Sequence, residues 1–197
     1  MSKLVRIGVV GTSWWADLWH LPSLTSHPAA SVVAICGRTR DPAEALARKY
    51  SIPAVYSDYR EMIDKGNLDA VIVAAPDDVH YAVTMDALEA GLHVLCEKPL
   101  AVTSTQARAM YVKAEAAGVR HMTFFTYRWM PYYRHLRQLV DDGIIGRGFH
   151  CSIRYVGGYG RSPAYGWRFD RRRGSGILGA NRSNALPGSV VGCKVVP

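Results

Sequence analysis

The sequence predicts an α/β fold in which a doubly wound parallel sheet is followed by a truncated second α+β domain. Three observations predict the sheet. Short apolar segments alternate with segments of helical spacing over the first 125 residues. The apolar segments are unbroken rather than alternating, which is typical of strands buried on both faces. Several of the helical segments also have explicit start and stop residues.

The expected strands are, in chain order, RIGVV, VVAIC, AVIVAA, HVLC and HMTFF, which end at residues 10, 36, 75, 96 and 125. Residues 41–44 (DPAE) offer Asp41 as an N-cap, with a proline at the first helical position. Residues 103–106 (TSTQ) offer a similar capping box, and that helix is expected to end at Gly118. The helix from about residue 79 to 90 is expected to end at Gly91.

The pattern changes after residue 125. An aromatic-rich connection is followed by a predicted helix over residues 132–142, with Gly143 as its stop, and then by a predicted strand beginning GFHCSIRY. From residue 157 onward no period is sustained, and ten of the 18 glycines lie in residues 147–197. This density is typical of irregular chain. The first domain is therefore expected to span residues 1–126.

The charge of the chain is unevenly distributed. Residues 1–146 hold 15 Lys/Arg and 15 Asp/Glu, so the net +8 comes entirely from residues 147–197. A basic tail binds phosphates without specificity, but the body has neither a basic stripe nor a helix-turn-helix or zinc spacing. We therefore expect no specific nucleic-acid partner, with salt-dependent binding by the tail as the remaining alternative.

No apolar segment is long enough to span a bilayer, so no membrane association is expected. The start of the chain lacks the features of a signal peptide. The four cysteines are far apart and form no CxxC pair. Free thiols of this kind are typical of a reducing compartment, so a cytoplasmic location is expected, and no metal site is predicted.

The first strand ends in a glycine turn. The dinucleotide pattern G-x-G-x-x-G/A falls on Gly11-Thr12-Ser13-Trp14-Trp15-Ala16, with a serine in the second glycine's place. The backbone amides of this turn are expected to face a pyrophosphate at a helix N-terminus. The sequence therefore predicts a Rossmann-like nucleotide site, although a strand–Gly–helix turn also occurs in α/β proteins without one.

The residues after the second strand bear on which cofactor is bound. Gly37-Arg38-Thr39 stands where a site for a free ribose 2′-hydroxyl usually has an acidic residue. Arginine offers a planar fork of donors that suits a 2′-phosphate. The sequence therefore favours NADP over NAD, with an ordinary basic surface loop as the alternative.

The chain resembles the Gfo/Idh/MocA oxidoreductases, the family of glucose–fructose oxidoreductase and inositol dehydrogenase. The resemblance covers residues 3 to about 179. It rests on GVVGTSWWADLWHLP (8–22), APDDVH (75–80), EKP (97–99), YRW (127–129), VDDGIIGRGFHCSIRY (140–155) and WRFDRRRGSGILG (167–179). It implies that residues 127–179 begin the family's substrate domain, that the substrate is a sugar, polyol or similar alcohol or carbonyl, and that hydride moves to or from a nicotinamide.

The resemblance also implies roles for individual residues. Lys98 would give or take the substrate's proton, because the lysine of Glu-Lys-Pro reaches the nicotinamide edge and the substrate oxygen in this family. Glu97 would orient Lys98 or contact the nicotinamide ribose. A proline after the lysine can fix the backbone, including through a cis bond. The other residues that would line the cofactor site are Ala75, Pro76, His80, Trp167 and Arg168. The residues alone instead favour His80 as a histidine at a helix N-terminus that is hydrogen-bonded to the backbone.

The resemblance stops where the family continues with Asp-x-Gly-x-His. Ala180, Arg182 and Asn184 stand at the Asp, Gly and His positions, and neither alanine nor asparagine exchanges protons near neutrality. Residues 180–197 are therefore expected to be a disordered tail unlike the family, belonging to a truncated and catalytically impaired oxidoreductase. The alternative is a non-catalytic dinucleotide-binding module. A homo-oligomer of the family type is not expected, since the oligomerisation sheet of the family lies beyond this point.

Overall fold

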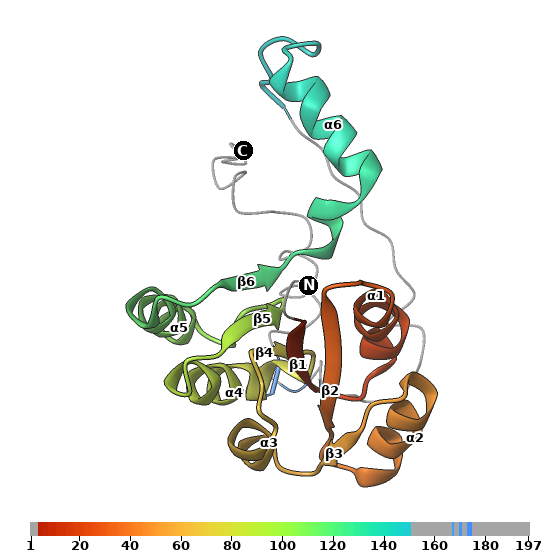
Figure 1. The fold of residues 1–197 in the computed structure, drawn as a ribbon. Coiled ribbons are helices and arrows are strands. Elements are labelled where there is room, and N and C mark those ends of the chain that lie inside the picture. Colours follow the sequence, from red (N-terminus) through yellow and green to blue (C-terminus); the bar gives the residue numbers. More distant parts are fainter. Residues whose placement is uncertain (1–3, 151–166, 168–169, 171–172, 175–197) are drawn as a thin grey trace.

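A computed structural model of the chain describes residues 4–150, 167, 170, 173 and 174. It contains a six-stranded parallel sheet with the strand order β3-β2-β1-β4-β5-β6 (Figure 1). The doubly wound α/β domain that the sequence predicts is thereby confirmed. The strands are β1 (Val5–Val10), β2 (Ala30–Cys36), β3 (Ala54–Tyr56), β4 (Ala70–Val73), β5 (His93–Glu97) and β6 (His121–Phe124).

Helices cover both faces of the sheet. The helices of the described chain are η1 (Ala16–His20), α1 (Leu21–Thr25), α2 (Arg40–Tyr50), α3 (Tyr59–Lys65), α4 (Asp77–Glu89), α5 (Ser104–Ala117), η2 (Thr126–Trp129) and α6 (Pro131–Asp141). In Figure 1, α1 and α2 lie on one face, and α3, α4 and α5 lie on the other. Each face has its own hydrophobic core because successive side chains of a strand point to opposite faces.

The two cores divide the strands residue by residue. Val71 and Val73 of β4 pack with α3, α4 and α5, whereas Ile72 between them packs with η1, α1 and α2. All three are at most 5 % exposed. An unbroken apolar strand is therefore what this sheet requires, and it explains why β4 carries no polar residue.

β1 lies between β2 and β4, so the order of the strands reverses direction at β1. The connections after β1 and β4 leave on opposite faces of the sheet, and a crevice opens outside their carboxyl ends. The glycine turn follows β1, and the segments at residues 37–39, 74–80 and 97–99 follow β2, β4 and β5. The topology thus gathers most of the predicted site residues at one edge.

Some predicted helix ends are confirmed. The Thr103 side chain accepts a hydrogen bond from the Gln106 amide at 3.2 Å, as the capping box predicts. α5 ends at Gly118 and α4 ends before Gly91, and both glycines have positive φ angles, of 64° and 71°. That backbone conformation favours glycine.

Other predicted helix starts were wrong. Asp41 is not an N-cap: α2 begins at Arg40, Thr39 holds the cap position, and Asp41 lies exposed in the first turn. The positive end of the helix dipole still stabilises a carboxylate in this first turn. α4 begins at Asp77, two residues earlier than expected, because Pro76 takes the extended backbone of its N-cap.

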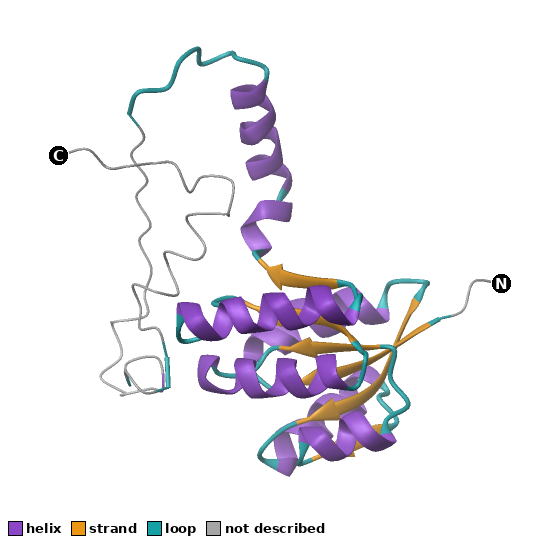
Figure 2. Ribbon diagram, turned by 90° about the vertical axis from the view of Figure 1, so that its left-hand side faces the viewer, coloured by secondary structure: helices purple, strands orange, loops and turns teal. Residues whose placement is uncertain are grey.

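The helix predicted over residues 132–142 is α6, which leaves the sheet and buries none of its residues (Figures 1 and 2). Residues 148–150 form no strand, and the remainder of the strand predicted there lies outside the described residues. The predicted boundaries at residues 126 and 179 stay predictions. Among the residues that the structure describes, no helix combines the length and apolar character needed to cross a membrane.

Candidate functional site

The glycine turn after β1 packs closely against its neighbours. Gly11 has φ 122°, and a Cβ there would lie 2.2 Å from the carbonyl oxygen of Ala74. Its amide donates to the carbonyl of Cys36 at 2.9 Å. A Cβ on Gly37 would lie 2.6 Å from Cγ2 of Thr12. The turn thus fits between the ends of β2 and β4 only because both positions lack a side chain.

Two amides of this turn are available to a ligand. Among the residues that the structure describes, the backbone N–H groups of Thr12 and Ser13 donate to no acceptor. Ser13 and Trp14 are exposed, and Trp15 is half-buried. Amides at the start of a helix bind phosphate through their donors and the helix dipole. The residues present therefore fit a dinucleotide pyrophosphate.

The helix after the turn is wound more widely than an α-helix. In η1 the Leu21 amide donates to the carbonyl of Ala16, five residues earlier, which is the π-helical pattern. This winding brings Trp15 and His20, also five residues apart, to the same acceptor. Segments of this kind often occur at functional sites.

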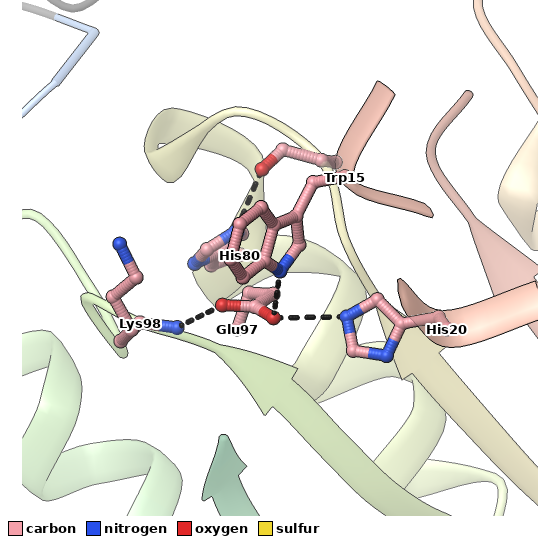
Figure 3. A network of polar contacts seen from close by, with 6 residues as sticks. Trp15, His20, His80, Glu97 and Lys98 are labelled. Atoms are coloured by element: carbon pink, nitrogen blue, oxygen red, sulfur yellow. Dashed lines mark hydrogen bonds and ion pairs between the residues drawn. The ribbon is translucent and has the colours of Figure 1, made fainter. Parts of the chain in front are cut away.

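That acceptor is the carboxylate of Glu97, the last residue of β5 (Figure 3). Trp15 Nε1 donates to Glu97 Oε1 at 2.7 Å, and His20 Nε2 lies 2.8 Å from the same oxygen. His20 and Glu97 are each only 5 % exposed. A buried carboxylate is stabilised when its oxygens accept several hydrogen bonds, so Glu97 holds the glycine-turn helix against the end of β5.

Lys98 follows Glu97 directly at the carboxyl edge of the sheet. Its backbone amide donates to Glu97 Oε2 at 3.1 Å, and its side chain extends away from that carboxylate (Figure 3). Lys98 is half-buried, and the Lys98–Pro99 peptide bond is cis. Of the two roles expected for Glu97, the structure shows contact with Lys98, made through the backbone of the lysine. The carboxylate oxygens already accept hydrogen bonds from the protein.

His80 of α4 connects two of these segments. Its Nδ1 lies 2.8 Å from the carbonyl oxygen of Pro99, and its Nε2 lies 2.8 Å from that of Ala75. The side chain is almost completely buried, with 1 % of its surface exposed. His80 therefore joins the end of β4 to the turn that carries Lys98, while Pro76 caps α4 beside it.

The end of β2 is more open. Gly37 is buried, but Arg38 and Thr39 are exposed. Thr39 makes no side-chain capping bond, and the described part of the chain offers Arg38 no hydrogen bond or ion pair. The neighbouring Arg40 is already held by Glu44 at 2.6 Å. Arg38 and Thr39 are therefore accessible to a ligand phosphate at this edge.

Arg173, which the sequence analysis did not predict as a site residue, contacts the start of α4. Arg173 Nε donates to Asp78 Oδ2 at 3.0 Å, at the start of α4. The Trp167 carbonyl accepts a hydrogen bond from the Asp170 amide at 3.2 Å. Arg168 lies outside the described residues. Since Asp78 and Arg173 are 95 residues apart, their pairing depends on the fold.

The buried thiols near the site are poor nucleophiles. Burial raises the pKa of Cys36, at the end of β2, to about 11, with a smaller contribution from Asp58. Burial likewise raises the pKa of Cys96 in β5 to about 12. Thiolate, the reactive form, is therefore scarce at neutral pH. Among the described residues, no His, Cys, Asp and Glu side chains form a group that could hold a metal ion.

Solved structures of other proteins resemble this chain in fold. A scyllo-inositol dehydrogenase from Lactobacillus casei with bound NAD(H) and scyllo-inositol is 27 % identical, with a TM-score of 0.69 over 73 % of this chain and 43 % of the other. A 3-ketoreductase from Actinomadura kijaniata in complex with TDP-benzene and NADP is 31 % identical, with a TM-score of 0.67 over 72 % and 45 %.

Curated proteins also resemble this chain in sequence. D-glucoside 3-dehydrogenase from Escherichia coli is 35 % identical over 153 residues, which are 78 % of this chain and 44 % of that enzyme. The chain spans about half the length of the curated relatives it matches, or less. The profile of the Gfo/Idh/MocA oxidoreductases, a family with an NAD-binding Rossmann fold, matches residues 5–125. With the fold and these relatives in agreement, the chain belongs to the Gfo/Idh/MocA family of NAD(P)-binding oxidoreductases.

Proposed function

We propose that the crevice binds NADP in preference to NAD, and that Lys98 moves a proton to or from the oxygen of a sugar or polyol. The observation that carries this proposal is the hydrogen bond from Trp15 to Glu97, because it ties the glycine turn to the residue directly before Lys98. The predicted phosphate site and the predicted proton carrier are thereby held in one rigid unit.

Different residues would bind the two phosphate groups of the cofactor, the pyrophosphate and the 2′-phosphate. The amides of Thr12 and Ser13 would hold the pyrophosphate, and Arg38 and Thr39 would hold the 2′-phosphate. Charge-assisted bonds from a guanidinium to phosphate are among the stronger hydrogen bonds in proteins. The exposure of Arg38 and its lack of a described partner support this assignment. When bound, the cofactor would supply or accept the hydride.

Lys98 would hold the exchanging proton at Nζ. A half-buried ammonium at the end of a strand lies at the edge where ligands of open α/β sheets bind. Its positive charge would also stabilise an alkoxide that develops on the substrate. The hydrogen bond between the Lys98 amide and Glu97 supports this role, because it fixes the backbone from which the amine extends.

The class of substrate is proposed from the relatives. A glucoside dehydrogenase, a levoglucosan dehydrogenase and an inositol dehydrogenase all act on rings that carry several hydroxyls. We propose the same class here, with residues 127–179 beginning the substrate domain. The second candidate is a dinucleotide-binding module without turnover, and Ala180 and Asn184 at the expected Asp and His positions favour it.

One pair of measurements tests the proposal and separates the two candidates. Titration with NADPH, followed by quenching of tryptophan fluorescence, should show saturable binding that is tighter than the binding of NADH. Turnover is then assayed with cyclic polyols and aldoses. Binding with turnover supports the enzyme, and binding without turnover supports the module. If neither NADPH nor NADH binds, both candidates are excluded.

The role of Lys98 is tested on any turnover that is found. Lys98→Met should abolish it and leave the Kd for NADPH nearly unchanged, because the substitution removes the proton carrier and not the phosphate site. Lys65→Met is the matched control, since Lys65 is an exposed lysine paired with Glu61 on α3. An unchanged rate in Lys98→Met would contradict the proposed role.

A further inference from the structure

The two contacts of His80 impose a condition on its protonation state. Both ring nitrogens lie 2.8 Å from backbone carbonyl oxygens, those of Pro99 and Ala75. A carbonyl oxygen only accepts hydrogen bonds, whereas a neutral imidazole has one N–H and one lone pair. In either neutral tautomer, one nitrogen lone pair would therefore face a carbonyl lone pair at hydrogen-bond distance.

We propose that His80 is an imidazolium in the folded protein, and that by donating to both carbonyls it positions the turn that carries Lys98. Ala75 lies at the end of β4, and Pro99 follows Lys98. The ring thus spans two neighbouring loops at the carboxyl edge. Figure 3 shows His80 in the same close-up as Trp15, Glu97 and Lys98, at this edge of the sheet. The proposed function of the site does not by itself require a charged His80.

His80 is only 1 % exposed, so a positive charge on it must be stabilised by neighbouring groups. Burying an unpaired charge is costly, and the N-terminal turn of α4 opposes a cation through its dipole. Two charge-assisted hydrogen bonds offset this cost. Two carboxylates, Asp77 and Asp78, lie in the same helical turn, and Asp77 is itself only 6 % exposed and three residues before His80.

Several other titratable groups on the neighbouring elements form hydrogen bonds or ion pairs with residues other than His80. β4 contributes none. The groups on the other elements are His93, Cys96 and Glu97 of β5, Lys98 of the following turn, Arg108, Tyr111, Lys113 and Glu115 of α5, Tyr59, Arg60, Glu61, Asp64 and Lys65 of α3, and Arg173. Glu97 accepts from Trp15 and His20, Lys113 pairs with Glu89 at the far end of α4, and Arg173 pairs with Asp78. We infer that Asp77 balances the charge of His80, because it is buried in the same helical turn, three residues before His80.

The protonation state is measured on the unchanged full chain. In a ¹⁵N-labelled sample at pH 7.5, long-range proton–nitrogen correlations of the His80 ring should show two protonated nitrogens with similar shifts. A neutral ring would instead show one strongly shifted, unprotonated nitrogen, and that result would overturn the proposal. The measurement needs no cofactor, so it is independent of whether the chain binds NADPH.

Variants assign the signal. His80→Gln should remove it, and His27→Gln, which changes an exposed histidine between α1 and β2, should leave it in place. Should His80→Gln fail to fold, nuclear Overhauser contacts to Pro99 and Val79 assign the ring in the unchanged chain.

The positioning role rests on the proposed role of Lys98 and is tested separately. Lysine amines are dimethylated with ¹³C-formaldehyde, and the Lys98 signal is identified by its loss in Lys98→Arg. In folded His80→Gln, the Lys98 methyl signal should shift or broaden while the signals of the other lysines stay unchanged. An unchanged Lys98 signal would show that His80 does not position it. If the unchanged chain does not bind NADPH while the Lys98 signal still shifts in His80→Gln, the result would instead count against the proposed function alone.

Discussion

The ends of β5 and β2 both meet the glycine turn, but they are built differently. At the end of β5, Glu97 is buried and accepts from Trp15, His20 and the Lys98 amide. At the end of β2, Arg38 and Thr39 are exposed, and Thr39 makes no capping bond. At the end of β5, where Lys98 is expected to act, the side chains are therefore held by hydrogen bonds within the protein. At the end of β2, which is expected to select the cofactor, the donor side chains are exposed to solvent. Substitutions should accordingly affect stability at the first edge and ligand affinity at the second.

The largest expected effect is that of Glu97→Ala. This change removes the shared acceptor of the buried His20 and the half-buried Trp15. A buried donor without an acceptor costs about 1–3 kcal/mol, and more where the lost partner is charged, so urea unfolding should show a loss of at least about 3 kcal/mol. Glu115→Ala removes an exposed contact with His121 and should cost less than about 1 kcal/mol. Equal losses in the two variants would refute the contrast between buried and open edges.

Alanine at each of the two glycines gives the next largest effect. In Gly11→Ala the new Cβ meets a backbone carbonyl at 2.2 Å and the residue keeps a φ of 122°, so a loss of at least about 2 kcal/mol is expected. In Gly37→Ala the Cβ meets a Thr12 methyl group, which can rotate away, so the loss should be about 1 kcal/mol. Thermal unfolding of both variants measures the difference. A larger loss at Gly37 would mean that the β2 edge is the more tightly packed of the two.

Arg38→Ala tests the open edge directly. The Kd for NADPH should rise about tenfold, equivalent to about 1.4 kcal/mol, while the Kd for NADH and the melting temperature stay unchanged. The control is Arg48→Ala, an exposed arginine farther along α2. If both variants weaken NADPH binding equally, the effect is one of general charge and not of a 2′-phosphate contact.

The smallest effect concerns the thiols at the two edges. In a chain with Cys151 and Cys193 changed to serine, neither Cys36 nor Cys96 should react with a disulfide reagent at pH 8, and both should react in urea. Burial raises both folded-state pKa values above the ordinary 9.0, to about 11 for Cys36 and about 12 for Cys96. The folded chain thus keeps protons that the unfolded chain loses, and stability falls as the pH rises above about 9. Labelling of Cys96 before Cys36 during an alkaline titration would contradict this order.

Much of the fold could be predicted because the sheet is buried on both faces. β2 and β4 appear in the sequence as almost entirely apolar segments, and β1, β5 and β6 appear as segments in which apolar residues predominate. β3 was missed because its three residues, Ala54–Tyr56, lie at the sheet edge and are only half-buried. A strand this short, directly after Pro53, leaves no pattern that separates it from a loop.

The site was predicted only in part. Gly11 and Lys98 lie in motifs that the sequence shows directly. The pairing of Trp15 with His20 could not be predicted, because residues five apart on an α-helix point about 140° away from each other. Only the wider winding of η1 brings them to one acceptor. The contact of Arg173 with Asp78 likewise leaves no local signal.

The central position of β1 has a consequence for the order in which the protein folds during synthesis. β1 is made before both of its partners, and one of them, β4, is complete only at residue 73. Until that residue leaves the ribosome, one side of β1 has unpaired backbone groups, which are prone to association with other chains. The nascent N-terminal third should therefore depend on chaperones more than the segments that follow it.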